Sequence, residues 1–280
     1  MTAVVMALSS AALFGLMTVL VRVALRRAPE PRDAPAALIL PALAIAVVAA
    51  AAIDPGGVED AWPFALAGLL APGASQIFFM LAVGAVGASR TSVVVGTAPL
   101  VSVAIALAWL GEPLSAPLLL GAVLVVAGGI ALVGERGRPE HLRVAGLVSA
   151  AVCTVLFATR DNLVRRFAVD PHSVPAGTAN AAALAAGALV ALAYARRLPP
   201  ARTLLSFLPA GACFGISYVL LFEAFYRGRV EVVAPLVATE SLWGVGLAAL
   251  VLRRSELVGR RLAVGAVLVV AGGALIGAFR

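Results

Sequence analysis

The sequence has very little charge for its length. Only 12% of its 280 residues are charged, whereas a soluble domain carries about a quarter. Lysine is absent, so all 21 basic residues are arginine. This shortage of charge excludes an ordinary soluble domain, because the surplus of apolar side chains must face something other than water.

Cysteine and histidine are also scarce. Cys153 and Cys213 lie within apolar runs, whereas His141 and His172 lie in separate polar joints. Two such thiols argue against a disulfide framework, and no cluster of residues has the spacing of a metal site. We therefore expect no metal, no cofactor and no catalytic residue, and hence no enzyme. The arginines form no single basic stripe with aromatic residues, so no nucleic-acid partner is expected either.

Long apolar runs are what the sequence has in abundance. The chain is 62% hydrophobic, with a mean hydropathy of +1.05, and a helix that crosses a bilayer needs about 20 apolar residues. The runs are continuous, which favours helices over strands of alternating polarity. We predict an all-α integral protein of the cell inner (plasma) membrane, with the lipid bilayer as its partner. Its ten transmembrane helices are expected at 3–21, 34–53, 62–86, 91–110, 115–134, 144–166, 175–195, 204–226, 232–252 and 258–279.

A nonapeptide occurs twice. The segment GAVLVVAGG stands at 121–129 and again at 265–273, an offset of 144 that also places Glu112 on Glu256. Nearer the N-terminus, an offset of 139 places Ser10 on Ser149. We interpret the chain as two homologous halves, with chance similarity between two Ala/Val/Gly-rich helices as the alternative.

The two halves are expected at 1–139 and 140–280, each with five transmembrane helices. Because five is odd, equivalent helices must cross the bilayer in opposite directions. The halves would then be inverted repeats, an architecture of secondary transporters in which substrate binds near the midplane.

The arginines divide unequally between the two membrane faces. The joints after odd-numbered helices hold fifteen of them and the other side holds five, with Arg160 inside a span. The positive-inside rule then places both termini outside the cytoplasm.

The end of the first half and its echo in the second carry a resemblance to a known family. The first segment reads TSVVVGTAPLVSVAIALAWLGEPLSAPLLLGAVLVVAGGIAL, with Pro99 thirteen residues before Glu112. In the second, Trp243 stands where the proline would be and Arg-Ser-Glu replaces Leu-Gly-Glu. The first helix adds an aromatic-Gly pair, Phe14 and Gly15, with a basic residue at position 22.

On these motifs the chain resembles the drug/metabolite transporter superfamily, specifically the EamA-type ten-helix permeases. The resemblance implies transport of small organic solutes such as amino acids, other metabolites or drugs, often by export. It also implies a path lined by helices 1, 3, 4, 6, 8 and 9, and termini in the cytoplasm, contrary to the arginine count.

Ionisable residues within the spans are the first candidates for a site, because burying them in a bilayer costs several kcal/mol unless they have a partner or face a water-filled cavity. Glu240 is either a carboxylate for a substrate amine or a proton, or a structural carboxyl bonded to a neighbouring helix. Arg160 can bind an anionic group, and Asp161 can pair with Arg165, four residues on. Glu223 is expected to pair with Arg227.

Uncharged residues complete the candidate site. Tyr218 and Trp243 are predicted to form an aromatic wall, or else to pack between helices or face lipid. Amides and hydroxyls such as Gln76, Asn180 and Thr97 either contact substrate or bond between helices. Residues predicted to serve gating or packing are Pro99, Pro235, Gly211 and Gly215.

The sequence thus predicts an exporter of amino acids or related metabolites that works by alternating access. A proton is a candidate coupling ion, and the protein is expected to be a monomer or a dimer. The alternatives are a multidrug exporter of the same fold and a non-transport membrane protein, either a membrane enzyme or a sensor subunit.

Overall fold

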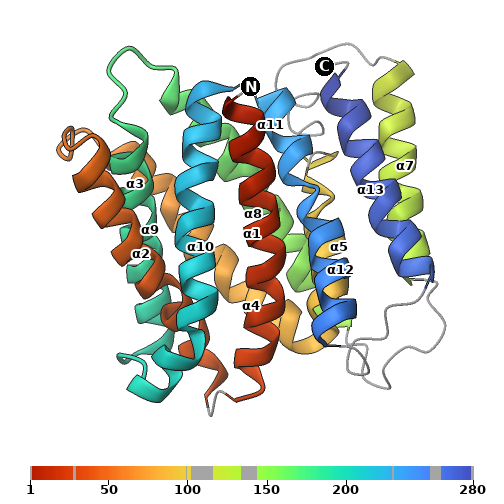
Figure 1. Ribbon diagram of the computed structural model, residues 1–280, viewed down its shortest axis with the longest axis horizontal. Helices are drawn as coiled ribbons and strands as arrows, with labels where there is room; N and C mark the ends of the chain where they lie inside the picture. The colour runs from red at the N-terminus through yellow and green to blue at the C-terminus, as the bar shows by residue number, and fades with distance from the viewer. Residues whose placement is uncertain are drawn as a thin grey trace.

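The computed structural model describes residues 2–27, 30–98, 100–101, 116–133, 144–228, 230–252 and 260–278. Within these ranges the chain is helical and has no strand, as the continuous apolar runs predict (Figure 1). In lipid only a helix or a closed barrel satisfies every backbone polar group. The helices are α1 (Thr2–Leu25), η1 (Pro31–Asp33), α2 (Ala34–Ile53), α3 (Trp62–Gly68), η2 (Leu69–Ala74), α4 (Ser75–Val86), α5 (Ala88–Val95), α7 (Ala116–Val133), α8 (Val144–Ala168), α9 (Ala176–Ala195), α10 (Ala201–Arg227), α11 (Val230–Val237), α12 (Glu240–Val251) and α13 (Arg260–Ala278).

Six of the described helical segments are long and apolar enough to cross a membrane. They coincide with the first three and the sixth to eighth predicted spans, so a multi-pass membrane protein is confirmed. Of the other four, 115–134 and 258–279 correspond to α7 and α13, and 232–252 is divided into α11 and α12. The remaining one, 91–110, is described only to residue 101, apart from residue 99.

The third predicted span is one path through the bundle but not one regular helix. The backbone of Ala71, just before Pro72, is extended, with φ −145° and ψ 119°. Proline interrupts helical hydrogen bonding, which accounts for the break between α3 and α4. Pro72 packs against Gly187 of α9, where a Cβ would come within 2.5 Å of the proline ring.

The first helices of the two predicted halves, α1 and α8, run in opposite directions. Arg22, near the end of α1, donates hydrogen bonds of 2.9 Å to the carbonyls of Val83 and Gly84, at the end of α4. Gly146, near the start of α8, packs against Ala85 and Val86 at that same place. Hence α1 ends where α8 begins. We call this the basic end of the bundle; the chain starts at the opposite end (Figure 1).

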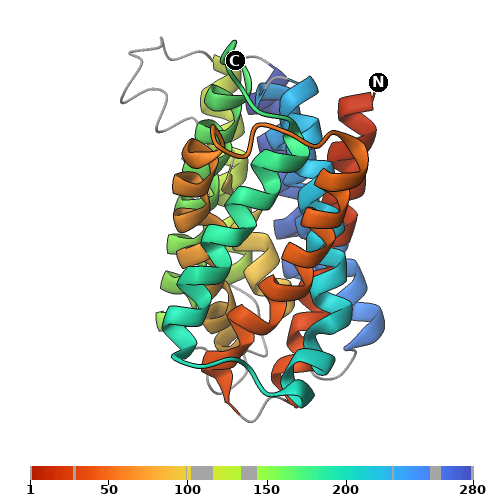
Figure 2. The ribbon, with the colours of Figure 1, turned by 90° about the vertical axis from the view of Figure 1, so that its left-hand side faces the viewer.

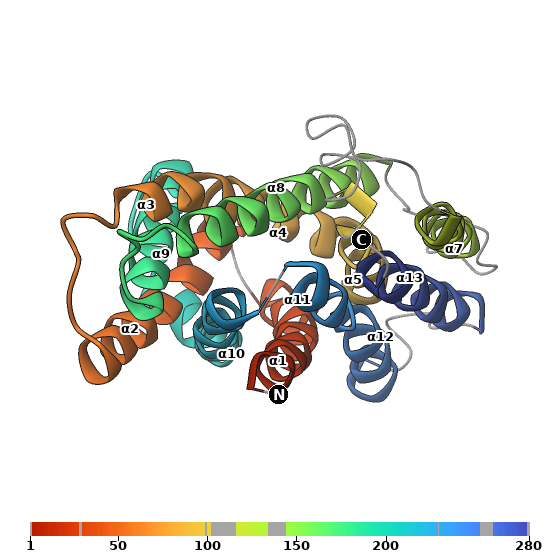
Figure 3. The same ribbon diagram turned by 90° about the horizontal axis from the view of Figure 1, so that it is seen from above.

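The first helices of the two predicted halves have similar packing partners. Helix α1 lies against α10 and α12, whereas α8 lies against α4 and α5. Seen along the bundle, α2, α3 and α9 form one flank, and α7 and α13 form the other (Figure 3). Figure 2, which faces the flank of α2, α3 and α9, shows α10 next to α2 and α9.

Glycines allow two close helix pairs. On α10, Gly211 lies against the Leu38 carbonyl and Pro41 of α2, and Gly215 lies against Ala42. A Cβ at either position would come within about 3 Å of α2, whose backbone carbonyl at Leu38 cannot give way. The small-xxx-small spacing thus falls where the sequence predicts close packing.

The two copies of the nonapeptide pack against each other. A Cβ at Gly128 of α7 would lie 2.7 Å from the carbonyl oxygen of Gly265 on α13. Reciprocally, a Cβ at Gly272 would lie 2.6 Å from the carbonyl oxygen of Gly121. The two contacts exchange under the offset of 144, so α7 and α13 meet as an antiparallel pair through equivalent residues.

Candidate functional site

A small cavity lies among the helices, and we call it the ion-pair cavity. Its volume is about 30 Å³. It is bounded by residues from α1, the end of α5, α8, α10, α11 and the start of α12. These lining residues are Phe14, Val95, Ala98, Phe157, Arg160, Asp161, Leu221, Ala234, Val237, Ala238 and Glu240. Three of the predicted candidates, Arg160, Asp161 and Glu240, therefore meet around one cavity.

Arg160 and Asp161 form an ion pair on α8. The Arg160 Nε lies 2.8 Å from Asp161 Oδ1, and the two side chains are 3% and 11% exposed. The alternative pair between Asp161 and Arg165 does not form, because Arg165 donates a hydrogen bond of 2.7 Å to the carbonyl of Phe225. A pair between neighbours is possible because the long arginine side chain folds back over the adjacent carboxylate.

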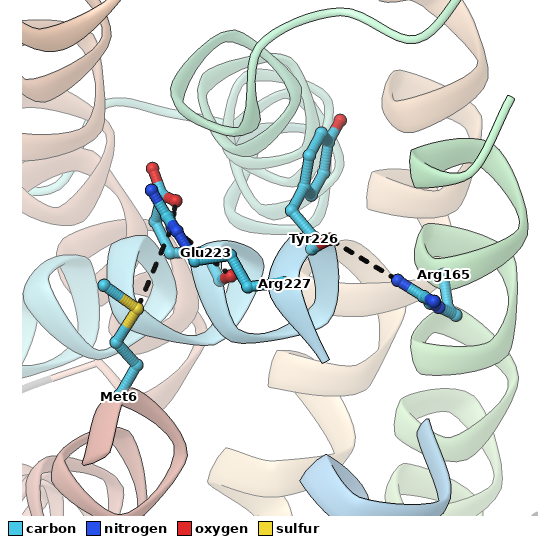
Figure 4. Close-up of polar contacts among 5 residues, drawn as sticks. All are labelled: Met6, Arg165, Glu223, Tyr226 and Arg227. Carbon is cyan, nitrogen blue, oxygen red and sulfur yellow. Dashed lines mark hydrogen bonds and ion pairs between the residues drawn. The ribbon is translucent and has the colours of Figure 1, made fainter. Parts of the chain in front are cut away.

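The expected pair between Glu223 and Arg227 is confirmed at the opposite end of the bundle from the basic end (Figure 4). Arg227 also approaches the sulfur of Met6 on α1, and Arg165 lies against the end of α10 near Tyr226. These contacts tie α8 and α1 to the end of α10. They keep Glu223 and Arg165 out of the ion-pair cavity.

Aromatic rings surround the Arg160 guanidinium. Its Cζ lies 4.8 Å from the ring centroid of Tyr218 and 5.7 Å from that of Phe157. Cations are attracted to the faces of such rings. Tyr218 itself is fully buried and packs edge-on to Phe14 at 5.8 Å. The Arg160 Nη1 atom is buried without a hydrogen-bond partner among the described residues, so it is a donor available to a ligand.

Glu240 stands where a helix is interrupted. Helix α11 ends at Val237, Ala238 and Thr239 form a turn, and α12 begins at Glu240. The Thr239 hydroxyl donates a hydrogen bond of 2.6 Å to the Leu236 carbonyl. This placement puts an acidic side chain in the first turn of a helix, where the helix dipole favours negative charge, and beside a cavity.

The first half contains the same turn. After α5, the Thr97 hydroxyl donates a hydrogen bond of 2.6 Å to the Val94 carbonyl, as Thr239 does to Leu236. Thr97 itself does not line the cavity, but the next residue, Ala98, does. Thr97 and Thr239 are 142 residues apart in the sequence. The same offset makes Ala98 the structural counterpart of Glu240. The offset of 144, which pairs Glu240 with Gly96, does not hold here.

Several predicted site residues lie elsewhere. Gln76 on α4 and Asn180 on α9 are fully buried, and their side-chain amides have no hydrogen-bond partner among the described residues. Neither lines the ion-pair cavity. Trp243 is 48% exposed, its Cβ and backbone pack against Gly15 of α1, and it is not among the residues that line the cavity. Pro235 lies within α11, three residues before the turn.

Pro99 lies outside the described residues, as do Glu112 and Glu256. Among the residues that the structure describes, no group of three His, Cys, Asp or Glu side chains is placed to hold a metal. Cys153 is buried, Cys213 is half-buried, and both are free thiols.

Most of the apolar lining was not singled out from the sequence. Phe157 lies one turn before Arg160 on α8, and this helical spacing is a signal that sequence reasoning had available. Val95, Ala98, Leu221 and Ala238 carry no such signal, because similar residues fill every span. Their role follows only from the way the helices meet.

Comparisons with known proteins bear on the family and the fold. Residues 1–134 match the EamA-like transporter family. Sixteen chains of solved structures also match. One of them, described only as "Crystal structure of protein", is 23% identical over 95% of this chain and 96% of its own, with a TM-score of 0.60. At this identity the likeness shows the fold alone.

No curated protein matches the chain. The resemblance carried by the sequence motifs agrees with the family match over residues 1–134. Residues 1–134 are thus similar to the EamA-like transporter family, consistent with the drug/metabolite transporter superfamily.

Proposed function

We propose that the chain is a secondary transporter of small organic solutes that carry both a carboxylate and an amine, such as amino acids. One observation carries this proposal: Arg160, Asp161 and Glu240 surround a single cavity within apolar helices. Ionisable groups inside a membrane mark solute or ion pathways, because burying them there without such a role is unfavourable.

The chemistry of the three side chains suits a zwitterion. The Arg160 guanidinium offers a donor to a carboxylate, since its planar fork matches carboxylate geometry. Glu240 and Asp161 offer acceptors to an ammonium group. Glu240 is also a carboxyl that can exchange a proton, so we propose it as the coupling site if transport is driven by a pH gradient.

The size of the cavity supports alternating access. A water molecule needs roughly 10–15 Å³ of such space, so a cavity of about 30 Å³ holds about two waters and no amino acid. Binding a solute therefore requires helices to separate. The interrupted helices at Thr97 and Thr239 lie at the cavity and are suitable places for such movement.

Three observations support inverted repeats as the basis of that movement, with halves at 1–139 and 140–280. Helices α1 and α8 run in opposite directions from the contacts at Arg22 and Gly146. The turns at Thr97 and Thr239 have matching hydrogen bonds. The nonapeptide copies pack antiparallel through equivalent glycines. Two such halves give a bundle that opens alternately to each side.

We further propose export from the cell across the inner membrane as the physiological direction, by a protein without enzymatic activity. The experiment is flux from proteoliposomes loaded with labelled amino acids, sugars, nucleotides and cationic drugs, with and without a pH gradient. Saturable flux of amino acids supports the proposal, and acceleration by the gradient adds proton coupling. Folded protein that moves none of these solutes contradicts it.

A multidrug exporter is the second candidate. The aromatic rings of Phe14 and Phe157 line the cavity beside two carboxylates, an arrangement that also suits an aromatic cation. Saturable flux of the cationic drugs in the same panel, without flux of amino acids, would favour this candidate.

A further inference from the structure

A second and larger cavity lies toward the basic end, and we call it the basal cavity. Its volume is about 600 Å³. It opens between the end of α1, the end of α4 and the start of α8. The residues that line it are Arg22, Leu25, Arg26, Pro31, Met80, Leu81, Gly84, Ala85, Ala145, Gly146 and Ser149.

One face of α8 connects the two cavities. Gly146 and Ser149 line the basal cavity, and Phe157 and Arg160 line the ion-pair cavity. These positions follow one another at intervals near one or two helical turns, so they share a face. At 1.5 Å per residue, the stretch from Gly146 to Arg160 spans about 21 Å, most of a bilayer core of about 30 Å.

Helix α1 follows the same course from the other side. Phe14 lines the ion-pair cavity, and Arg22 and Leu25 line the basal cavity two to three turns further along. The two cavities are therefore stacked along the bundle between the same two helices. They lie in line and do not stand side by side.

Cys153 lies between them on α8. It falls one turn after Ser149 and one turn before Phe157, and it is fully buried. Thus the thiol stands at the closed point between the two cavities.

The charged side chains in the described lining of the basal cavity are all basic. Arg22 and Arg26 line it, and no acidic side chain belongs to its described lining. Asp33, two residues after the lining residue Pro31, forms an ion pair with Arg197. An aqueous cavity with this lining raises the local concentration of anionic groups.

We propose that the basal cavity is an aqueous vestibule of the solute path that favours anionic groups, and that Cys153 belongs to the barrier separating it from the ion-pair cavity. The kind of solute in this inference rests on the proposed function. The positions of the vestibule and the barrier rest on the geometry of the two cavities. A solute with a carboxylate meets Arg26 and Arg22 first and reaches Arg160 after the barrier opens.

Thiol accessibility tests the inference without requiring a known substrate. Ser149→Cys is placed in a Cys153→Ala, Cys213→Ala background, with Ala145→Cys as a second variant in case the first folds poorly. Vesicles of each orientation are treated with the impermeant reagents MTSES, an anion, and MTSET, a cation. Rates are normalised to those with a free small thiol.

We expect modification only from the basic end, with MTSES favoured by about threefold or more. Adding Arg26→Gln should lower this preference. Cys153, as the sole cysteine in a Cys213→Ala chain, should react at least about tenfold more slowly than Ser149→Cys, because the closed barrier buries it.

The vestibule, its preference for anions and the role of Cys153 in the barrier are each overturned by a different outcome. No modification at position 149 or 145 from either side would show a groove that faces lipid. Equal normalised rates for the two reagents would remove the preference for anions. Cys153 reacting as fast as Ser149→Cys would remove it from the barrier. None of these outcomes depends on flux, so the failure of the proposed function remains a separate result.

Discussion

Arg160 and Asp161 are adjacent in the chain and form a buried ion pair, with Nε and Oδ1 2.8 Å apart. Neighbouring residues on a helix do not ordinarily face each other. Here the pair lines a cavity that Glu240 also lines, and two aromatic rings lie close to the guanidinium. The arrangement balances the charge of the arginine and leaves its Nη1 donor without a hydrogen-bond partner among the described residues.

The first prediction concerns the contribution of this ion pair to stability and to flux. Arg160→Gln or Asp161→Asn alone should destabilise the protein by about 3 kcal/mol, because each leaves a buried charge without its partner. The double variant should recover most of that stability but not solute flux. Thermal unfolding in detergent and flux in proteoliposomes measure the two properties separately. A double variant as unstable as the single ones would show that the ion pair is not the cause.

The packing of the nonapeptide copies makes the second prediction. Gly128→Ala and Gly272→Ala should each lower stability by about 1–3 kcal/mol, because the added methyl meets a backbone carbonyl that cannot move. The two losses should be similar, since the contacts are equivalent.

Gly246→Ala on α12 is the matched control. No atom lies within 4 Å of a Cβ placed there, so the change should be neutral or slightly stabilising. The unfolding temperatures of the three variants measure these effects on stability. A loss at Gly246 equal to those at Gly128 and Gly272 would contradict the packing account.

A loop contact at the basic end makes the third prediction. Arg197 donates two hydrogen bonds to Asp33, of 3.1 and 2.8 Å, and Asp33 is 1% exposed. These hydrogen bonds raise the pKa of the Arg197 guanidinium, which stays charged at any physiological pH. Arg197→Gln should lower the unfolding temperature, because it leaves the Asp33 carboxylate buried without a cation.

Arg196→Gln, at the neighbouring position, is its control and should change the unfolding temperature much less. Arg196 has φ 59° at the end of α9, and its side chain is exposed. Equal losses for the two variants would indicate a general effect of charge and not the contact with Asp33.

Orientation makes the fourth prediction. The described chain begins and ends at the same end of the bundle, opposite the basic end (Figure 1). The arginine distribution places that end outside the cytoplasm, whereas the family resemblance places it inside. A reporter fused after Arg280 that is active only in the periplasm would agree with the arginine count. Activity only in the cytoplasm would contradict it.

Much of the fold could be predicted from the sequence, because apolar length alone decides where a chain crosses a bilayer. The spans 34–53 and 175–195 agree with α2 and α9 to within a residue. The interruption at Ala238–Thr239 could not be located in this way, since Pro235 precedes it inside a regular turn of helix. Hydropathy does not distinguish a broken helix from a continuous one.

The candidate site could be predicted in part for a similar reason. Glu240, Arg160 and Asp161 stand out because charge is rare in apolar runs, and the structure brings them together. Asn180 and Trp243 stand out equally in sequence but lie apart from the cavity. The direction in which a helix turns its side chains depends on its neighbours, and polarity alone does not reveal it.

The most direct test of the central claim compares Glu240→Gln with Glu223→Gln for amino-acid flux in proteoliposomes. Both changes remove one carboxylate, but Glu240 lines the ion-pair cavity, whereas Glu223 pairs with Arg227 near the end of α10. We predict a loss of flux of about tenfold or more for Glu240→Gln, with unchanged folding, and near-normal flux for Glu223→Gln. Normal flux in folded Glu240→Gln would contradict a solute path through this cavity.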